Sequence, residues 1–458
     1  MNQFAARLRT LAKGGQNGIA SYMLRGVSTS FLLQGFGLAL VTGSSVLLAR
    51  LLGAAGYGTY SYVLAWLEIL KIPVAYGLPI MVQREVAVYA AREDWSLVRG
   101  LFTRLNQFII AMSALIVALA VVSATFGIAG LFDDVVERRT LFIALVSLPI
   151  AAFSANRAAT LNGLHLIGKA AFPDQIVRPS TTIVMIGVFW LLGVGLTAET
   201  AMIAQVTGIA CAFGLGALFL WRALPVGFAA LPARFETRVW IRGLGPFLLH
   251  GASYVVWASL AVVMLGWYRS PAEVGVYRAA ALAAGLSIFP ITAFVATVSP
   301  LVARLYAEGD KARIQKVVST TTLAMFAFGF CGVAGYALIG HWLLAFVFGR
   351  EFDSGYWPLI IIAGGNWVVS GIWSVGVLLD MSGHQRFPAI AYVAAACANV
   401  GIGLVLIPPL GMIGAAASTA ISWALVHGWM AIMVRRCIGL RADVLYAVFA
   451  LSRQRPMR

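Results

Sequence analysis

Apolar stretches of about 20 residues recur along this chain from one end to the other, separated by short polar or glycine-containing turns. A helix of that length crosses the hydrocarbon core of a bilayer, because each residue adds 1.5 Å of rise. The pattern therefore predicts an all-α polytopic membrane protein with about twelve transmembrane helices. The expected spans lie near residues 28–49, 59–82, 106–131, 140–162, 176–195, 200–221, 246–267, 275–300, 317–341, 357–380, 388–407 and 414–434.

The composition agrees with a membrane protein, since 61% of the residues are hydrophobic and only 11% are charged. The net charge of +16 would suggest nucleic acid in a soluble protein. Here the charges lie between spans, where Lys and Arg mark the cytoplasmic side, so no nucleic-acid partner is expected. With the N-terminus inside, 26 Lys and Arg residues fall on the inner side and six on the outer side. Both termini are therefore predicted to lie in the cytoplasm.

The chain also repeats itself. A shift of 217 residues places Gly58 on Gly275, Tyr60 on Tyr277 and Pro73 on Pro290. Each half then holds six helices, so we expect two six-helix bundles related by a pseudo-two-fold axis along the membrane normal. The two prolines should kink equivalent helices. Two such bundles around a central cleft are typical of alternating access.

Five regions follow from the spans. They are a cytoplasmic amphipathic N-terminal segment (1–27), an N-terminal six-helix bundle (28–221), a cytoplasmic linker (222–245), a C-terminal six-helix bundle (246–434) and a basic cytoplasmic tail (435–458). The four cysteines are scattered without metal spacing, so neither zinc nor a disulfide is indicated.

Several motifs resemble those of a known family. The segment LLARLLGAAGYGTYSYVLAW is similar to the signature that follows the first helix of bacterial polysaccharide flippases, in the multidrug/oligosaccharidyl-lipid/polysaccharide exporter superfamily. EVGVYRAAALAAGLSIFPITAFVATVSPLVARLYAEGD, FGREF and GMIGAAAST fit the same family in order. The resemblance covers residues 25–435 and implies a flippase of the bacterial inner membrane. Its substrate would be a polyprenyl-pyrophosphate-linked oligosaccharide, such as an O-antigen, capsule or exopolysaccharide repeat unit.

Charges within the spans are the first candidates for a substrate site. Glu68 and Lys71 lie deep in the second span, where a charge costs roughly 2.5–3.5 kcal/mol on insertion scales. Lys71 is expected to line the cavity and bind substrate phosphates, while Glu68 tunes its charge or exchanges a proton. The alternative interpretation is a self-neutralising pair that fills the bundle interior.

Arginines near the two mouths of the cavity are the next candidates. Arg25 on the inner side and Arg278 on the outer side are predicted to bind the substrate headgroup, since guanidinium suits phosphate. Interfacial anchoring is the alternative for both. Arg50 is expected to fix a loop by binding helix-end carbonyls. Arg84 and Arg157 are interpreted mainly as positive residues at inner helix ends.

Aromatic side chains in the tenth span are candidates for contacts with the sugar rings of a glycan. Asn366, Trp367 and Trp373 form a polar-aromatic face in the tenth span that could stack on sugar rings, or simply pack against a neighbouring helix. No nucleophile–base constellation or metal cluster stands out. We therefore expect no enzyme activity, no catalytic residue, no metal and no cofactor.

The expected partners are the lipid-linked oligosaccharide, membrane lipids, and polymerase and chain-length proteins of the same pathway. One alternative is a cation-coupled multidrug exporter of the same superfamily, which acidic cavity residues would favour. Another is a membrane enzyme or scaffold of polysaccharide assembly. An enzyme would need a larger outer loop than this chain offers.

Overall fold

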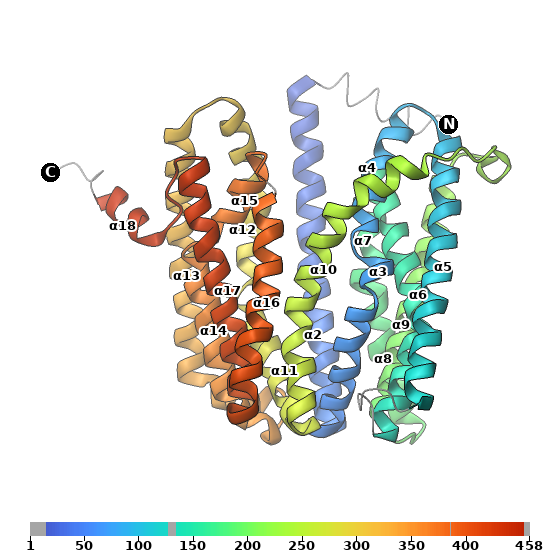
Figure 1. Cartoon of the computed structure of the whole chain (residues 1–458), viewed down its shortest axis with the longest axis vertical. Coiled ribbons are helices and arrows are strands. Elements are labelled where there is room, and N and C mark those ends of the chain that lie inside the picture. The colour runs from blue at the N-terminus through green and yellow to red at the C-terminus, as the bar shows by residue number, and fades with distance from the viewer. Residues whose placement is uncertain (1–14, 127–133, 385, 453–458) are drawn as a thin grey trace. The chain divides into compact units, whose positions relative to one another are not determined.

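The computed structural model of the 458-residue chain describes residues 15–126, 134–384 and 386–452, and its secondary structure there is helical (Figure 1). Eight helices of these residues are long and apolar enough to cross a membrane. The number rises to nine if a pair bent by 45°, Arg350–Ser370 and Ser374–Met381, is one span. The all-α polytopic prediction is confirmed at this level.

Packing divides the chain into two units. Unit 1 comprises Met1–Leu47 and Leu70–Gly251, and unit 2 comprises Leu48–Ile69 and Ala252–Arg458. The chain thus passes from one unit to the other inside helix α2 (Gly15–Leu70) and inside helix α10 (Thr237–Tyr268). The bundle boundaries expected from the sequence stay a prediction.

Unit 1 is built around α6, which packs against α4 and α9. Helix α9 packs in turn against α8 and the π-helix η1. The helices that lie wholly in this unit are α3 (Ile72–Ala75), α4 (Leu78–Ala91), α5 (Trp95–Phe126), α6 (Val135–Gly163), α7 (Ile167–Phe172), η1 (Pro173–Val177), α8 (Arg178–Leu191), α9 (Ala198–Ala223) and the 3₁₀-helix η2 (Phe228–Ala230).

Unit 2 is built around α17, which packs against α16 and α14, while α14 packs against α13 and α11. Its own helices are α11 (Pro271–Leu286), α12 (Phe289–Ala307), α13 (Lys311–Val347), the 3₁₀-helix η3 (Arg350–Gly355), α14 (Tyr356–Ser370), α15 (Ser374–Met381), α16 (Arg386–Leu410), α17 (Met412–Cys437) and α18 (Val444–Ser452). Helix α18, red at the edge of Figure 1, packs on α13.

The first two predicted spans are not separated by a loop. Helix α2 runs through the first and continues into the second as far as Leu70, interrupted at Gly53, whose backbone is non-helical with φ 69° and ψ 178°. A positive φ is easy for glycine, so one residue bends the chain without a turn sequence. The prediction of a loop around residues 50–58 is therefore wrong. The chain bends at Gly53 of the signature instead.

Three predicted spans are interrupted instead. The second ends at Leu70 and resumes as α3 and α4. The eighth is split into α11 and α12, and the tenth into α14 and α15. Pro73 and Pro290 both stand in the first turn after a break, because proline lacks the N–H that a continuing helix needs. The predicted kinks at these two repeat-related prolines are confirmed.

The repeat-related glycines of unit 2 also meet. A Cβ on Gly58 would lie 1.7 Å from the carbonyl oxygen of Pro271, and a Cβ on Gly275 would lie 2.1 Å from that of Ala54. Only glycine allows α2 and α11 to approach so closely. A structural role for both residues agrees with their place in the repeated motif.

Arg50 fixes the end of α13, as expected. Its Nε donates to the carbonyl of Val347 at 2.7 Å, and Nη2 donates to the carbonyl of Phe346. These carbonyls end a helix and have no partner within it, so the guanidinium satisfies them. Glu351 accepts from the amide of Ala54 at 2.9 Å, beside the bend at Gly53.

The two ends of the chain lie partly outside the described residues. Helix α2 begins at Gly15, so the predicted N-terminal segment is described only in its second part. In the tail, Gln315 of α13 holds the segment before α18 through two hydrogen bonds to the backbone of Arg441, at 2.6 and 2.9 Å. Arg453, Arg455 and Arg458 lie outside the described residues.

Candidate functional site

The break in the second span carries the two charged residues that the sequence singled out. Lys71 stands between α2 and α3, and its carbonyl accepts from the amides of Val74 and Ala75 at 3.1 and 2.8 Å. Gly77, with φ +85°, separates α3 from α4. Glu68 lies in the last turn of α2, and both charged side chains are partly buried. Glu68 belongs to unit 2 and Lys71 to unit 1, so their substrate roles stay predictions.

The two arginines predicted to bind the substrate headgroup, Arg278 and Arg25, lie on different helices. Arg278 lies on α11 and is exposed, although Tyr277 and Ala279 on either side are buried. Its guanidinium is thus available to an anion on that face of unit 2. Arg25 lies on α2, and its side chain falls outside the described residues. Both substrate-binding roles stay predictions.

The strongest buried charge cluster of unit 1 is one that the sequence misjudged. Arg157 of α6 is only 3% exposed, so interpreting it as a positive residue at an inner surface is wrong. Its Nη2 donates to Asp174 Oδ2 at 2.7 Å and to Ser154 Oγ at 2.9 Å. The Ser154 hydroxyl donates to the other carboxylate oxygen at 3.0 Å. One side of the guanidinium is therefore neutralised inside the bundle.

The other side of that guanidinium has no acceptor among the described residues. Arg157 Nε and Nη1 are buried without a hydrogen bond, and a Cβ on Gly216 of α9 would lie 1.8 Å from Nη1. The missing side chain at position 216 is what makes room for the arginine. Removing Asp174 would leave the buried guanidinium without its counter-charge, which is destabilising.

Local helix geometry brings the Asp174 carboxylate next to the Arg157 guanidinium. It lies in the π-helix η1, where one extra residue per turn rotates the following side chains. Gln175 in the same turn faces α2, since a Cβ on Gly37 would lie 2.6 Å from Gln175 Oε1. The sequence signal was present, because an aspartate directly follows Phe172–Pro173 at the start of an apolar span. Nothing in the sequence paired it with Arg157.

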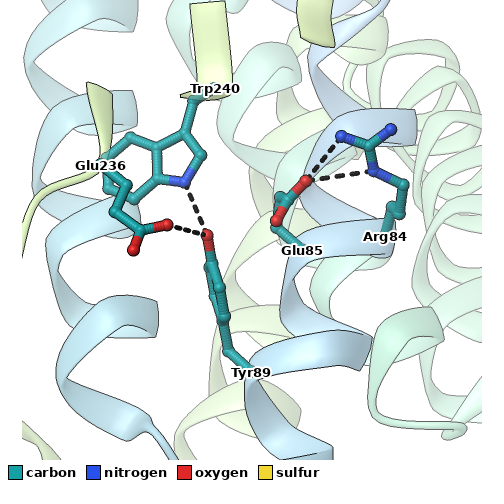
Figure 2. Close-up of polar contacts among 5 residues, drawn as sticks. All are labelled: Arg84, Glu85, Tyr89, Glu236 and Trp240. Carbon is teal, nitrogen blue, oxygen red and sulfur yellow. Dashed lines mark hydrogen bonds and ion pairs between the residues drawn. The ribbon is translucent and has the colours of Figure 1, made fainter. Parts of the chain in front are cut away.

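A second polar cluster of unit 1 ties the linker to α4 and α10. Figure 2 shows Glu236 and Trp240 converging on the Tyr89 hydroxyl, with Glu85 facing Arg84. The Tyr89 hydroxyl donates to Glu236 at 3.2 Å and accepts from Trp240 Nε1 at 3.0 Å. Burial raises the pKa of Tyr89 to about 12, so the phenol stays protonated and can donate.

Neighbouring contacts complete this attachment. Arg84, about half exposed, pairs with Glu85 at 2.7 Å, and its interpretation as a positive residue at an inner helix end stays a prediction. Arg234 of the linker pairs with Asp94 at 3.3 Å, and its amide donates to the carbonyl of Ser96 at 3.1 Å. A Cβ on Gly100 would lie 1.7 Å from the carbonyl oxygen of Arg234. The linker is thus a fixed part of unit 1.

The predicted sugar-contact residues of unit 2 point to three different neighbours. Asn366 Nδ2 donates to the carbonyl of Ala284 in α11 at 3.3 Å. Trp367 packs on Phe326 and Phe330 of α13, with ring centroids 5.0 and 5.4 Å away. Trp373 stacks on His427 of α17 at 5.6 Å. These contacts agree with the packing alternative, and the sugar-contact role of the three residues stays a prediction.

An aromatic core lies beside them. Trp257 of α10 stacks on Trp423 of α17 with centroids 4.0 Å apart, and donates through Nε1 to Ser422 Oγ at 3.2 Å. His427 is 4% exposed and contacts the ring of Trp423. Asn399 Nδ2 donates to the Trp257 carbonyl at 3.2 Å. This cluster holds α10, α16 and α17 together within unit 2.

No group of three or more His, Cys, Asp or Glu residues within the described part of the chain has metal-binding geometry. Among the described charges, Arg157 and Asp174 form an ion pair, whereas others, such as Arg278, are exposed on a helix face. The exposed cations can bind anions, and the ion pair stabilises the charge of Arg157 within the helix bundle.

Comparison with known proteins agrees with this picture. Residues 23–306 match the family model described as polysaccharide biosynthesis protein. A probable low-salt glycan biosynthesis flippase, Agl15 of Haloferax volcanii, is 24% identical over 398 residues, which cover 86% of this chain and 79% of Agl15.

Two solved structures share the fold. An inward-facing multidrug resistance MATE family transporter of the MOP superfamily superposes with a TM-score of 0.73 at 13% identity, covering 91% of this chain and 95% of that one. The lipid II flippase MurJ superposes with a TM-score of 0.68 at 14% identity, covering 90% and 87%. These likenesses confirm the predicted all-α polytopic fold class, and the orientation of the termini stays a prediction.

The family model covers well over half of the sequence, including the signature around Gly53 and Gly58 and the repeat of that signature at Gly275. The family predicted from these motifs is thereby confirmed. This chain belongs to the polysaccharide biosynthesis protein family.

Proposed function

We propose that this protein is a flippase that moves a polyprenyl-pyrophosphate-linked oligosaccharide between the leaflets of a bacterial inner membrane by alternating access. The family match over residues 23–306 carries the proposal, and the likeness to a glycan biosynthesis flippase over 86% of the chain supports it. The flippase transports and performs no covalent chemistry. The polymerase and chain-length proteins of the same pathway are the expected partners.

The broken helices support a transport function. Lys71 lies at the break before α3 in unit 1, and the break between α11 and α12 lies two helical turns from Arg278 in unit 2. In many transporters, interrupted helices at equivalent positions of two repeats form the substrate site, because the freed backbone groups can bind ligand. In the flippase, Lys71, Arg25 and Arg278 bind the pyrophosphate, and Glu68 adjusts the charge next to Lys71.

A multidrug exporter is the second candidate, because the MATE transporter shares the fold. The charges of unit 1 favour an anionic substrate instead. Asp174, the carboxylate next to the buried Arg157, is already bound to that guanidinium at 2.7 Å. A cationic drug that used the Asp174 carboxylate would have to displace the Arg157 guanidinium from it.

Leaflet transfer tests the proposal. Purified protein is reconstituted into vesicles with a fluorescent polyprenyl-pyrophosphate oligosaccharide, and the accessible fraction is followed over time. We expect transfer by the wild type and a loss of about tenfold or more in Lys71→Ala and Arg278→Ala. Lys169→Ala and Arg139→Ala are the matched controls, since both residues are exposed elsewhere in unit 1.

Each outcome has a consequence. Transfer that is indifferent to Lys71→Ala and Arg278→Ala, in variants that melt like the wild type, keeps the flippase and rejects these residues as its site. Absence of transfer for several glycans, together with efflux of a cationic dye from the same vesicles, would establish the exporter instead. Absence of both activities would favour a scaffold.

A further inference from the structure

A pocket of about 340 Å³ opens at the end of the α12–α13 hairpin in unit 2. Its polar lining consists of Arg304 and Glu308 from the end of α12, and Arg313 and Lys316 from the start of α13. The turn between the helices contains Gly309 with φ +74°, which folds the two helix ends side by side. Three cations and one carboxylate therefore face a common space.

The ion pairs around this pocket leave donors free. Glu308 accepts from Arg304 Nε at 2.7 Å, and Asp310 accepts from Arg313 Nε at 3.2 Å. The terminal nitrogens of both guanidinium groups make no further ion pair among the described residues. Lys316 is exposed, and no described carboxylate pairs with it. The pocket thus retains an excess of positive charge and several N–H donors, which suits a phosphate group.

The remaining walls are apolar. Leu301, 43% exposed, and Val317, half-buried, line the same pocket beside the charges. Helix α13 begins at Lys311 and is a candidate membrane span, so its charged first turns lie where the apolar part starts. Positive side chains at that level of a membrane helix meet lipid headgroups. Apolar side chains next to them would contact the glycerol backbone and the start of the acyl chains.

We propose that this pocket binds the phosphate headgroup of an anionic membrane phospholipid. The phosphate is bound by Lys316 and the free guanidinium nitrogens of Arg304 and Arg313. The acyl chains leave past Leu301 and Val317 along the hairpin. Free inorganic phosphate offers the same anion without the apolar contacts, so the two sources can be separated by affinity. This site is distinct from the proposed substrate residues and does not depend on the transported glycan.

The test is native mass spectrometry of the purified full chain in a neutral detergent. Phosphatidylglycerol, phosphatidylcholine and inorganic phosphate are titrated separately, and the bound adducts are counted. We expect the wild type to prefer phosphatidylglycerol, and Lys316→Glu to weaken that binding by about tenfold or more. Lys311→Glu is the charge-matched control, because it lies on the same helix, is exposed and does not line the pocket. Its affinity should stay within about twofold.

Several results would overturn the proposal. Equal losses in Lys316→Glu and Lys311→Glu would reduce the effect to general electrostatics. Equal binding of phosphatidylglycerol and phosphatidylcholine would remove the headgroup preference. Inorganic phosphate bound as tightly as the lipid would exclude a lipid-specific site. If Lys316→Glu does not fold, Lys316→Gln provides the same comparison, with Lys311→Gln as its control.

Discussion

At the scale of single residues, the buried position of the Arg157 guanidinium depends on the absence of a side chain at Gly216 in α9. A methyl group at Gly216 would lie 1.8 Å from Arg157 Nη1. The arginine could avoid it only by leaving Asp174 and Ser154, both within 2.9 Å. We therefore expect Gly216→Ala to lower the free energy of unfolding by about 1–3 kcal/mol. Thermal melting of the purified protein in detergent measures this.

Gly214 in the same helix provides the control. Outside its own stretch of helix, no heavy atom of the described residues lies within 4 Å of the position that its methyl group would take, so Gly214→Ala should melt at or above the wild-type temperature. Equal melting of both variants would show that Arg157 moves freely and that its pairing with Asp174 is dispensable.

Tyr89 gives a prediction that depends on pH. Its hydroxyl joins Glu236 and Trp240, and the residue is 4% exposed, so Tyr89→Phe should cost about 1–2 kcal/mol at neutral pH. Burial raises its pKa from 10.0 to about 12. A raised folded-state pKa means that the stabilisation is fully present below about pH 10. It is lost as the pH rises towards 12.

The measurement is the difference in unfolding free energy between wild type and Tyr89→Phe at several pH values. That difference should be constant up to about pH 10 and shrink above it. Tyr306→Phe is the control, since Tyr306 is 37% exposed. A difference that grows above pH 10 would mean that the phenolate, and not the phenol, is the stabilised form.

Sequence reasoning succeeded for some residues and failed for others on physical grounds. Arg50 was correctly expected to bind helix-end carbonyls, because a charged residue beside a bend has few other partners. Arg157 was misjudged, because its surroundings depend on α9 and on the π-helix turn that holds Asp174. Residue spacing along one helix says nothing about the helix that packs against it.

At the scale of elements, the crossing of α2 and α11 in unit 2 tolerates only glycine. A Cβ at Gly58 would meet the backbone carbonyl of Pro271 at 1.7 Å, and backbone cannot rotate away as a side chain can. Gly58→Ala should therefore cost about 3 kcal/mol or more and sharply reduce the yield of folded protein. Size-exclusion chromatography of a fluorescent fusion measures that yield.

Gly43→Ala is the matched control on the same helix, because no described heavy atom lies within 4 Å of its Cβ position. Normal folding of Gly58→Ala would show that α2 and α11 can separate there without penalty. Gly275→Ala, with its contact at 2.1 Å, should behave like Gly58→Ala if the two glycines form one crossing.

The helix breaks show how far the hydrophobic pattern predicts structure at this scale. Pro73 and Pro290 indicate the breaks because proline removes a hydrogen-bond donor. The break between α14 and α15 has no proline, and Gly371 and Trp373 between them carry no comparable signal. Helix ends were also displaced, as in α10, which begins at Thr237 inside the predicted linker. Those ends depend on contacts such as Trp240 with Tyr89.

At the scale of the whole molecule, the fold class followed from hydropathy, because a lipid environment permits few backbone arrangements. The grouping of helices depends on tertiary contacts that hydropathy does not report. Packing assigns residues 48–69 to unit 2 and residues 222–251 to unit 1. Hydropathy reports only length and polarity. The grouping is set by tertiary contacts such as the close backbone approaches at Gly58 and Gly77 and the ion pair of Arg234 with Asp94.

The orientation in the membrane is the property on which both the substrate and the lipid-site proposals depend. Inner segments hold 26 Lys and Arg residues and outer segments six, so the linker should face the cytoplasm and the α8–α9 turn the outside. With the four exposed cysteines replaced by serine, we introduce Ala229→Cys or Gly195→Cys. A membrane-impermeant maleimide should label Gly195→Cys in intact cells, and Ala229→Cys only after permeabilisation. The reverse pattern would invert the protein and place the pocket of Arg304, Arg313 and Lys316 at the outer leaflet.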